Sequence, residues 1–310
     1  MTPLDARIEA PTEHPPLYRH QERVNWHFTN DSVYWRKIYH QRDVFAAAHQ
    51  LRSGIALEWI DALGLPSGSR VLEVGCGAGL MTLALASRGF AVTAMDTVQA
   101  MLNETGRVVV RAGVAARVRT ALGDVHQLSL KDNTFAMVIA LGVVPWLHSP
   151  SGALQEMARV LEPGGCLIVN ADNRWRMNYC LDPFRFPALM PVRRRIRRTL
   201  EQQGLWREFP AKACSQPHSL REFDALLAGS GLRNERRKTF GFGPFTFLNC
   251  SLLPNSAGMK IHQWLQSLAD HQVPIIRSAG SQYLVLARKS ALKYGAAEGM
   301  EGRATSALSA

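Results

Sequence analysis

A carboxylate followed by a glycine-rich turn is the strongest chemical signal in this chain of 310 residues. Glu73 lies in a short apolar segment, and Gly75, Gly77 and Gly79 follow it directly. Glycine is needed where the backbone turns sharply and where a bound nucleoside must approach it without interference from a Cβ atom. The spacing differs from the Gly-x-Gly-x-x-Gly pattern of dinucleotide sites, so no pyrophosphate contact is expected. A plain strand-to-helix turn is the alternative interpretation.

Two further carboxylates come at the ends of later apolar segments. Asp96 follows the glycine turn at a spacing where a carboxylate can accept both hydroxyls of a ribose. Gly123–Val125 ends a third segment. The carboxylate of Asp124 could accept a hydrogen bond from an adenine amino group there. Leu141–Val144 ends a fourth segment, at the switch point of strand order where ligands bind in such sheets. Each feature alone is typical of a loop, but their order together predicts a nucleoside site.

The elements that position these residues alternate between strands and helices. Because the connections are short, the alternation predicts a parallel, doubly wound α/β sheet. Expected strands cover 70–74, 90–95, 117–121, 135–141, 166–170, 232–240 and 283–287, with helices over 80–87, 99–112, 151–161 and from 219 to about 230.

The remaining segments are predicted to surround this core, which spans 65–290. Residues 1–64 are expected to form an N-terminal helical extension or cap, with helical periodicity from about 21 to 63. Residues 173–218 are expected to be an inserted lid, and 241–280 a second insertion. Residues 291–310 are rich in Ala, Gly, Ser and Glu, and are expected to be a disordered tail.

Residues 70–171 resemble the core of class I S-adenosylmethionine-dependent methyltransferases. The segments that carry the resemblance are Glu73–Gly79, Met95–Asp96, Ala121–Val125 and Ala158–Gly165. The resemblance implies a Rossmann-like, seven-stranded sheet whose last strand is antiparallel. It also implies that the chain is an enzyme with S-adenosyl-L-methionine as cofactor and S-adenosyl-L-homocysteine as product.

The same resemblance implies roles for individual residues. The glycines of the turn would pack against the cofactor, and Asp96 would bind its ribose. Asp124 and Val125 would face the adenine, while Glu73 would orient the methionine part. The full set of implied cofactor contacts is Glu73, Gly75, Cys76, Gly77, Gly79, Asp96, Thr97, Gly123, Asp124, Val125, Leu141 and Gly142.

Aromatic side chains are the candidates for contact with the methyl acceptor. Trp35 and Tyr39 lie in the N-terminal segment, where similar proteins place helices over the cofactor mouth. Trp146 follows Pro145 where many relatives carry Glu-His, and Trp175 and Tyr179 begin the lid. For each of them, packing within the fold is the alternative interpretation.

A general base is needed only if the accepting atom must lose a proton. Methyl transfer from a sulfonium is an in-line displacement, which the protein promotes mainly by positioning the reactants and excluding water. His148, just after the fourth strand, is the first candidate for such a base, although a polar loop histidine is the simpler interpretation. His126, Tyr179 and Asp172 are the other candidates. No group of His, Cys and acidic residues has metal-ligand spacing, so no metal is expected.

The chain has a formal net charge of +11, and the positive charge is concentrated in the lid. Between Arg174 and Lys212 there are ten Lys or Arg and three acidic residues, which leaves the core closer to neutral. The basic lid could bind an anionic or carrier-linked small molecule or a membrane surface, or it could be a solvated face. Nucleic acid is disfavoured because no known RNA-binding signature is present. Gly241–Phe247 could form a second pocket wall or a contact between copies.

Composition narrows the class of protein. The apolar fraction, 46%, is that of a globular protein, and no apolar run is long enough for a membrane-spanning helix. The first residues do not resemble a secretory signal. Five scattered cysteines show no disulfide spacing, so a reduced, cytoplasmic protein is expected.

These patterns predict methyl transfer from S-adenosylmethionine to a small or lipid-like acceptor, on O, N or C, in secondary or lipid metabolism. One alternative is an RNA or protein methyltransferase that uses the basic lid. Leu141–Val144 stands where enzymes of that kind carry an Asn-Pro-Pro-Tyr-type segment, which favours a small acceptor. A second alternative is a protein of the same fold that uses the cofactor for non-methylating chemistry.

Overall fold

A seven-stranded sheet forms the centre of the computed structural model, which describes residues 16–30, 38, 41–203, 215–248 and 250–291. The strand order is β3-β2-β1-β4-β5-β9-β6. A separate pair is formed by β7 (Thr246–Phe247) and β8 (Cys250–Ser251). The strands of the large sheet are β1 (Arg70–Val74), β2 (Ala91–Asp96), β3 (Val118–Leu122), β4 (Phe135–Ala140), β5 (Leu161–Asp172), β6 (Leu232–Phe240) and β9 (Gln282–Lys289).

The direction of the strands confirms the predicted topology. Strands β1 to β5 pair in parallel, whereas β9 runs antiparallel to both of its neighbours, β5 and β6. The carboxyl ends of β1, β2, β4 and β5 therefore meet at one edge. The order of the chain reverses between β1 and β4, so the switch point of the sheet lies at that edge.

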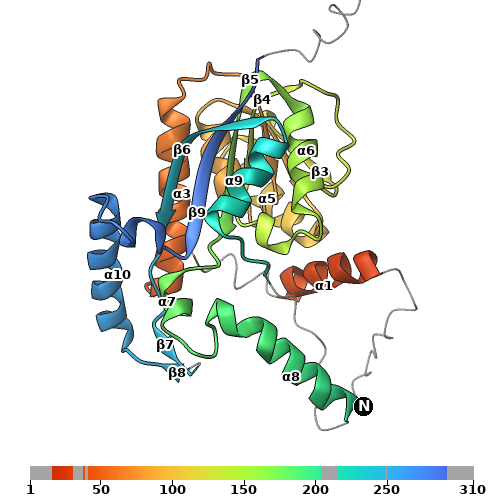
Figure 1. Ribbon diagram of the computed structural model, residues 1–310. Helices are drawn as coiled ribbons and strands as arrows, with labels where there is room; N and C mark the ends of the chain where they lie inside the picture. Colours follow the sequence, from red (N-terminus) through yellow and green to blue (C-terminus); the bar gives the residue numbers. More distant parts are fainter. Residues whose placement is uncertain (1–15, 31–37, 39–40, 204–214, 249, 292–310) are drawn as a thin grey trace, which may run out of the picture.

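Helices cover both faces of the sheet because successive strand residues point to opposite sides. In β4, Met137 and Ile139 belong to one core cluster, and Val138 belongs to the other. Helices α3 (Val44–Ala62), α4 (Leu80–Ser87) and α5 (Gln99–Arg111) pack on the first face, and α6 (Pro150–Val160) and α9 (Leu220–Gly229) on the second (Figure 1).

The N-terminal helical region is divided in two. Helix α1 (Pro16–Asn30) is separate from α3, because Asp43 caps α3 by accepting the amide N–H of Ala46 at 2.8 Å. Helix α3 packs on the sheet through Ile55, Trp59 and Ile60, so it is one of the layers of the core.

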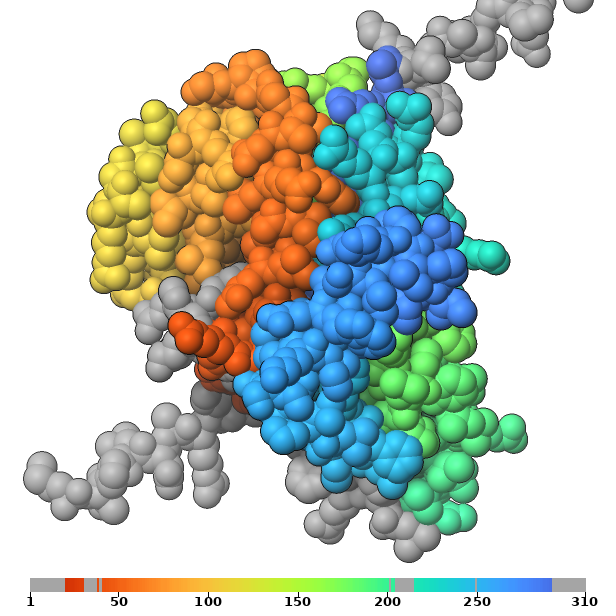
Figure 2. Space-filling view, turned by 90° about the vertical axis from the view of Figure 1, so that its left-hand side faces the viewer, coloured from red at the N-terminus to blue at the C-terminus, as the bar shows by residue number. Residues whose placement is uncertain are grey.

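The two predicted insertions lie next to each other. The first contains α7 (Met177–Cys180) and α8 (Met190–Gln202), and the second contains β7, β8 and α10 (Asn255–Asp270). The side chain of Asn178 donates to the carbonyl of Pro244 at 3.3 Å, which joins the two insertions. Figure 2 shows α10 beside α3. Within the described part of the chain, no helix is both long and apolar enough to cross a membrane.

Strand β5 begins five residues earlier than predicted. The segment around Pro163 and Gly164 was expected as a turn before a strand at Cys166, but Leu161 already pairs with Phe135 of β4. The register then shifts before Met137 pairs with Cys166. The strand therefore absorbs the expected turn as a local irregularity.

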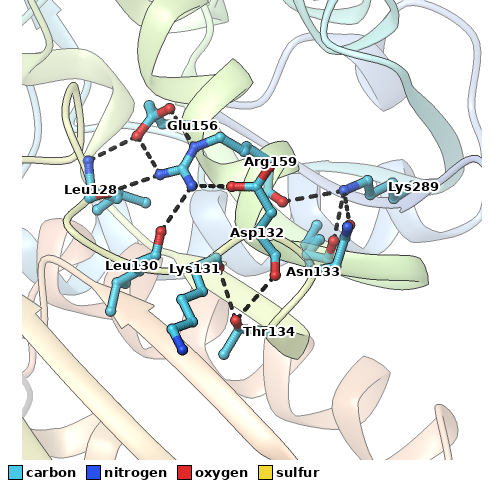
Figure 3. Close-up of polar contacts among 10 residues, drawn as sticks. Leu128, Leu130, Lys131, Asp132, Asn133, Thr134, Glu156, Arg159 and Lys289 are labelled. Atoms are coloured by element: carbon cyan, nitrogen blue, oxygen red, sulfur yellow. Dashed lines mark hydrogen bonds and ion pairs between the residues drawn. The ribbon is translucent and has the colours of Figure 1, made fainter. Parts of the chain in front are cut away.

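Arg159, in the segment that carries the family resemblance, fastens α6 to the connection between β3 and β4 (Figure 3). Its guanidinium forms ion pairs with Glu156 at 2.8 Å and with Asp132, and donates to the carbonyls of Leu128 and Leu130, both at 2.8 Å. Lys289 of β9 donates to the carbonyl of Leu161 nearby. Such contacts order the loop that leads from the end of β3 to β4.

We expect Arg159→Met to lower the free energy of unfolding by about 2 kcal/mol, because two backbone carbonyls and Glu156 lose their donor together. Urea denaturation measures the change. Arg107→Met is the control, because Arg107 is exposed and makes one surface ion pair, with Glu104. Equal stability of the two variants would contradict a structural role for Arg159.

Candidate active site

A cavity of about 470 Å³ lies at the edge of the sheet where the carboxyl ends of the strands meet. Its walls come from the turns after β1, β2, β3 and β4, from α1 and α3, and from the two insertions. The residues of the sequence motifs and the lid therefore meet around one space. We describe the half near β1 to β3 as the nucleoside corner and the half near β4, β5 and the lid as the acceptor half.

The glycine turn forms one wall of the nucleoside corner. Gly75 and Gly77 line the cavity with positive φ angles of 68° and 53°. The amide groups of Gly75 and Cys76 both donate to the carbonyl of Met95, at 2.8 and 3.0 Å, which ties the turn to the end of β2. A Cβ atom on Gly75 would lie 2.5 Å from the side chain of Val143, so a larger residue would displace the turn.

Gly79 has a different position from the one that the resemblance implied. It does not line the cavity, and a Cβ atom there would lie 2.8 Å from the backbone of Thr105 on α5. Its φ of 80° begins α4 in the left-handed region. The glycine therefore permits close packing of α4 on α5 and stands away from the space that a cofactor could fill.

Asp96 stands at the end of β2 with its carboxylate at the centre of the nucleoside corner. It accepts the amide N–H groups of Gly77 and Val98, both at 2.9 Å. Burial raises the pKa of this carboxyl, while the backbone donors oppose the shift. The carboxylate is thus oriented by the turn that it faces, in the place expected for a ribose-binding group.

Glu73 lies beneath the turn, almost completely buried. The hydroxyl of Thr82 on α4 donates to its carboxyl group. Burial raises the pKa of Glu73 to about 8, and the bond from Thr82 only partly offsets this effect. The side chain reaches the cavity wall, so a cation placed there would meet a group that can become negative.

The end of β3 supplies Asp124 and Val125, which both line the cavity. One carboxylate oxygen of Asp124 accepts the amide N–H of His126 at 2.9 Å and lies 2.6 Å from Nδ1 of the same residue. This pairing with His126 holds the pKa of Asp124 below its usual range. Gly123 also lines the cavity and packs on Met95.

The end of β4 lines the acceptor half of the cavity with Leu141 and Gly142. The amide N–H of Gly142 donates to the side chain of Asn170 on β5 at 2.6 Å. A Cβ atom on Gly142 would lie 2.9 Å from the guanidinium of Arg52, which α3 places over the turn. The sequence motifs do not reveal Arg52, because it lies in α3, far along the chain from the turn that it contacts.

Comparison with known proteins identifies the domain that carries the glycine turn and the strands around the cavity. Residues 72–169 match the family model of a methyltransferase domain. These residues therefore form a methyltransferase domain. Magnesium protoporphyrin IX methyltransferase from Synechocystis PCC 6803, solved with bound S-adenosylhomocysteine, has the same fold with a TM-score of 0.57 and 18% identity. The alignment covers 87% of this chain and all of that one.

Curated relatives match this methyltransferase domain over part of their length. A ubiquinone biosynthesis O-methyltransferase of Pseudomonas putida is 28% identical over 137 residues, which cover 44% of this chain and 58% of the relative. An uncharacterized methyltransferase of Mycobacterium bovis is 36% identical over 113 residues, covering 36% of this chain and 42% of the relative. The chain therefore spans about half the length of these relatives.

Helix α1 covers the methyltransferase domain at the nucleoside corner, an arrangement that the sequence motifs do not show. The hydroxyl of Thr97 donates to the side chain of Asn25 at 2.8 Å, and His20 donates to the carbonyl of Trp146 at the same distance. Gln21 and Phe28 of α1 line the cavity. The predicted contacts Trp35 and Tyr39 lie outside the described residues.

In the acceptor half, the structure places two of the predicted aromatic residues at the cavity, Trp146 and Tyr179. Trp175 does not reach it, because its half-exposed side chain turns toward Phe186. Phe45 and His49 of α3 contribute instead.

His148 stands behind the cavity wall of the methyltransferase domain. Its ring stacks on that of His126 at 3.6 Å between centroids, and it is absent from the cavity lining. Burial, followed by the neighbouring His126, lowers its pKa. Of the four predicted bases, Asp172 and Tyr179 line the cavity, whereas His126 and His148 do not. No cluster of metal-binding side chains occurs among residues that the structure describes.

Proposed function

We propose that the protein transfers the methyl group of S-adenosylmethionine to a small-molecule acceptor. The observation that carries this proposal is a single cavity that joins the nucleoside corner to an acceptor half built by the lid. The backbone at Gly77 has open space on the side where a Cβ atom would stand, and Asp96 presents a carboxylate oriented by two amides. These residues fit the ribose and adenine of the cofactor.

The cofactor supplies an activated methyl group when it is bound, so the chain itself mainly has to position and enclose the reactants. Asp96 and Glu73 would hold the ribose and the amino group of the methionine part. Leu141 and Gly142, at the switch point, would border the methyl group. Helix α1 would shield the corner from water through Val24 and Phe28, which line the cavity.

Charges in the cavity are unevenly placed, which supports an acceptor with an anionic group. The nucleoside corner holds the acids Glu73, Asp96 and Asp124, whereas Arg52, Arg176 and Arg185 line the acceptor half. We infer that a carboxylate, a phosphate or a phosphate-bearing carrier enters on the arginine side.

Arg176 is the best anchor for such a group. Its side chain is buried, its Nε atom has no hydrogen-bond partner among the described residues, and its ion pair with Asp172 is long, at 3.7 Å. The guanidinium lies over the ring of Tyr179 at 3.8 Å. Trp146 also lines the cavity, and its ring favours a flat acceptor because an aromatic group could stack on it. The assignment of the P. putida relative to ubiquinone biosynthesis agrees with an acceptor of this kind.

If the accepting atom must lose a proton, Asp172 and Tyr179 are better placed than His148. We therefore expect His148→Gln to retain kcat close to that of the unchanged protein, because His148 lies behind His126. Steady-state kinetics with the acceptor, once found, measures this. A large fall in kcat with unchanged thermal stability would indicate that His148 takes part in the reaction.

The proposal is tested in two steps. Isothermal titration calorimetry with S-adenosylhomocysteine should give a saturable signal in the micromolar range, and absence of binding by the folded protein would overturn the proposal. Incubation with radiolabelled S-adenosylmethionine and separate pools of small metabolites, lipids, RNA and protein then identifies the acceptor. Label in the metabolite or lipid pool supports the proposal, whereas label only in RNA or protein would contradict it.

A further inference from the structure

Helix α8 is the most exposed helix of the lid and has no part in the cavity. Every side chain from Met190 to Thr199 is exposed, and Leu200 is half-buried. In Figure 1 the helix extends away from the sheet, beyond α7. A helix in this position contributes little to the core, so its sequence is free to serve another purpose.

The two sides of α8 differ strongly in character. Val192, Ile196 and Leu200 are spaced by four residues and so form one stripe along the helix. Val192 and Ile196 are each 55% exposed, although both are apolar. Arg194 and Arg198 lie opposite this stripe, Arg195 and Arg197 flank it, and Arg193 lies beside Leu200. The helix has a single acid, Glu201.

More apolar side chains lie at the same end of the molecule. Phe184 precedes α8 in the lid, and Phe247, Leu248 and Leu252 lie in or beside β7 and β8. All four are at least 46% exposed. A hydrogen bond of 2.7 Å from Thr246 to Asp182 joins the β7–β8 pair to the lid. Both Figure 1 and Figure 2 show the β7–β8 segment and the lid at the lower end of the molecule.

We propose that α8 is a membrane-surface helix that lies in the interface of an anionic lipid bilayer. Its apolar stripe would enter the boundary of the acyl chains, and its arginines would contact lipid phosphates. Phe247 and Leu248 would enter the same layer. This inference rests on the outer surface of the lid and is independent of the cofactor site.

The charge and the apolar stripe together favour a bilayer over a nucleic acid. A nucleic acid would pair with the arginines but leave Val192 and Ile196 in water. A bilayer with anionic headgroups satisfies both sides of the helix at once. The segment that carries α8 also supplies Arg176 and Tyr179 to the cavity wall, so membrane contact would bring the acceptor half near the lipid surface.

Vesicle co-sedimentation of the full chain tests the proposal. The probes are vesicles of phosphatidylglycerol with phosphatidylcholine, and vesicles of phosphatidylcholine alone. Two double variants are compared with the unchanged protein. Arg194→Gln with Arg198→Gln removes two positive charges, and Val192→Ser with Ile196→Ser removes two apolar side chains of the stripe. Their matched controls are Arg107→Gln with Arg233→Gln for charge, and Trp264→Ser on α10 for exposed apolar surface. Thermal unfolding of each variant shows that it is folded.

We expect the unchanged protein to bind the anionic vesicles and not the neutral ones. The arginine pair should weaken the partition coefficient about 30-fold, and the apolar pair about tenfold or more. The controls should each change it less than twofold. Equal binding to neutral vesicles, an equal loss in the charge control, or full binding by the apolar variant would each overturn the proposal. Binding to an RNA duplex through Arg194 and Arg198, with no binding to vesicles, would assign the helix to nucleic acid instead.

Discussion

The Glu73→Gln variant is expected to lose most of the pH dependence that the buried carboxyl gives to the stability of the ligand-free protein. The pKa of Glu73 is about 8 in the folded state, above its ordinary value of 4.5. The folded state therefore binds more protons than the unfolded state between these two values. The contribution of Glu73 to stability is then greatest at low pH and is lost as the pH rises to about 8.

The size of this effect is on the order of 5 kcal/mol across the window, since one pKa unit corresponds to about 1.4 kcal/mol. Gln has the shape of Glu and can accept the bond from Thr82, but it cannot ionise. Urea denaturation of both proteins at about pH 5 and pH 8 measures the difference. Glu58→Gln on the exposed side of α3 is the control, and it should keep the pH dependence of the unchanged protein. Parallel pH profiles for the unchanged protein and Glu73→Gln would contradict a carboxyl that is protonated in the fold.

The second large effect is expected at Asp96. We expect Asp96→Ala to weaken the binding of S-adenosylhomocysteine roughly 5- to 150-fold, which corresponds to about 1–3 kcal/mol. The ribose hydroxyls would lose their acceptor, and the amides of Gly77 and Val98 would lose theirs as well. Calorimetry measures the affinity directly.

Two further variants make this test specific. Asp96→Asn keeps the size of the side chain and one acceptor oxygen, so it should lose less affinity than Asp96→Ala. Asp61→Ala removes an exposed carboxylate that pairs with Arg88 on the surface, and it should bind as the unchanged protein does. Unchanged affinity in Asp96→Ala would contradict a role of Asp96 in binding S-adenosylhomocysteine.

The parallel strands and the turns at their ends could be predicted from the sequence because their signals are local. A buried parallel strand is a continuous apolar run, and Phe135–Ala140 needs no distant partner to be recognised. The turn after β1 likewise carries its own glycines. Asp96 and Asp124 follow because each comes directly at the end of a strand.

The N-terminal residues that contact the cavity could not be predicted individually, because their contacts join distant segments. Asn25 and Thr97 are 72 residues apart, and nothing in the periodicity of α1 indicates that they meet. The position of Arg52 could not be predicted for the same reason, because α3 brings it close to Gly142, which is distant in the sequence. His148 is a different case. Its place after β4 suggested that its side chain would reach the cavity, but its ring stacks on His126.

The origin of the cavity walls bears on how acceptor preference can change during evolution. The nucleoside corner is built from the ends of β1, β2 and β3, whose register the sheet fixes. Arg176 and Tyr179 come from a segment inserted after β5. Replacement of that insertion would leave the hydrogen bonds around Asp96 intact. Acceptor choice can therefore diverge by exchange of one surface segment, while the chemistry of the methyl donor stays constant.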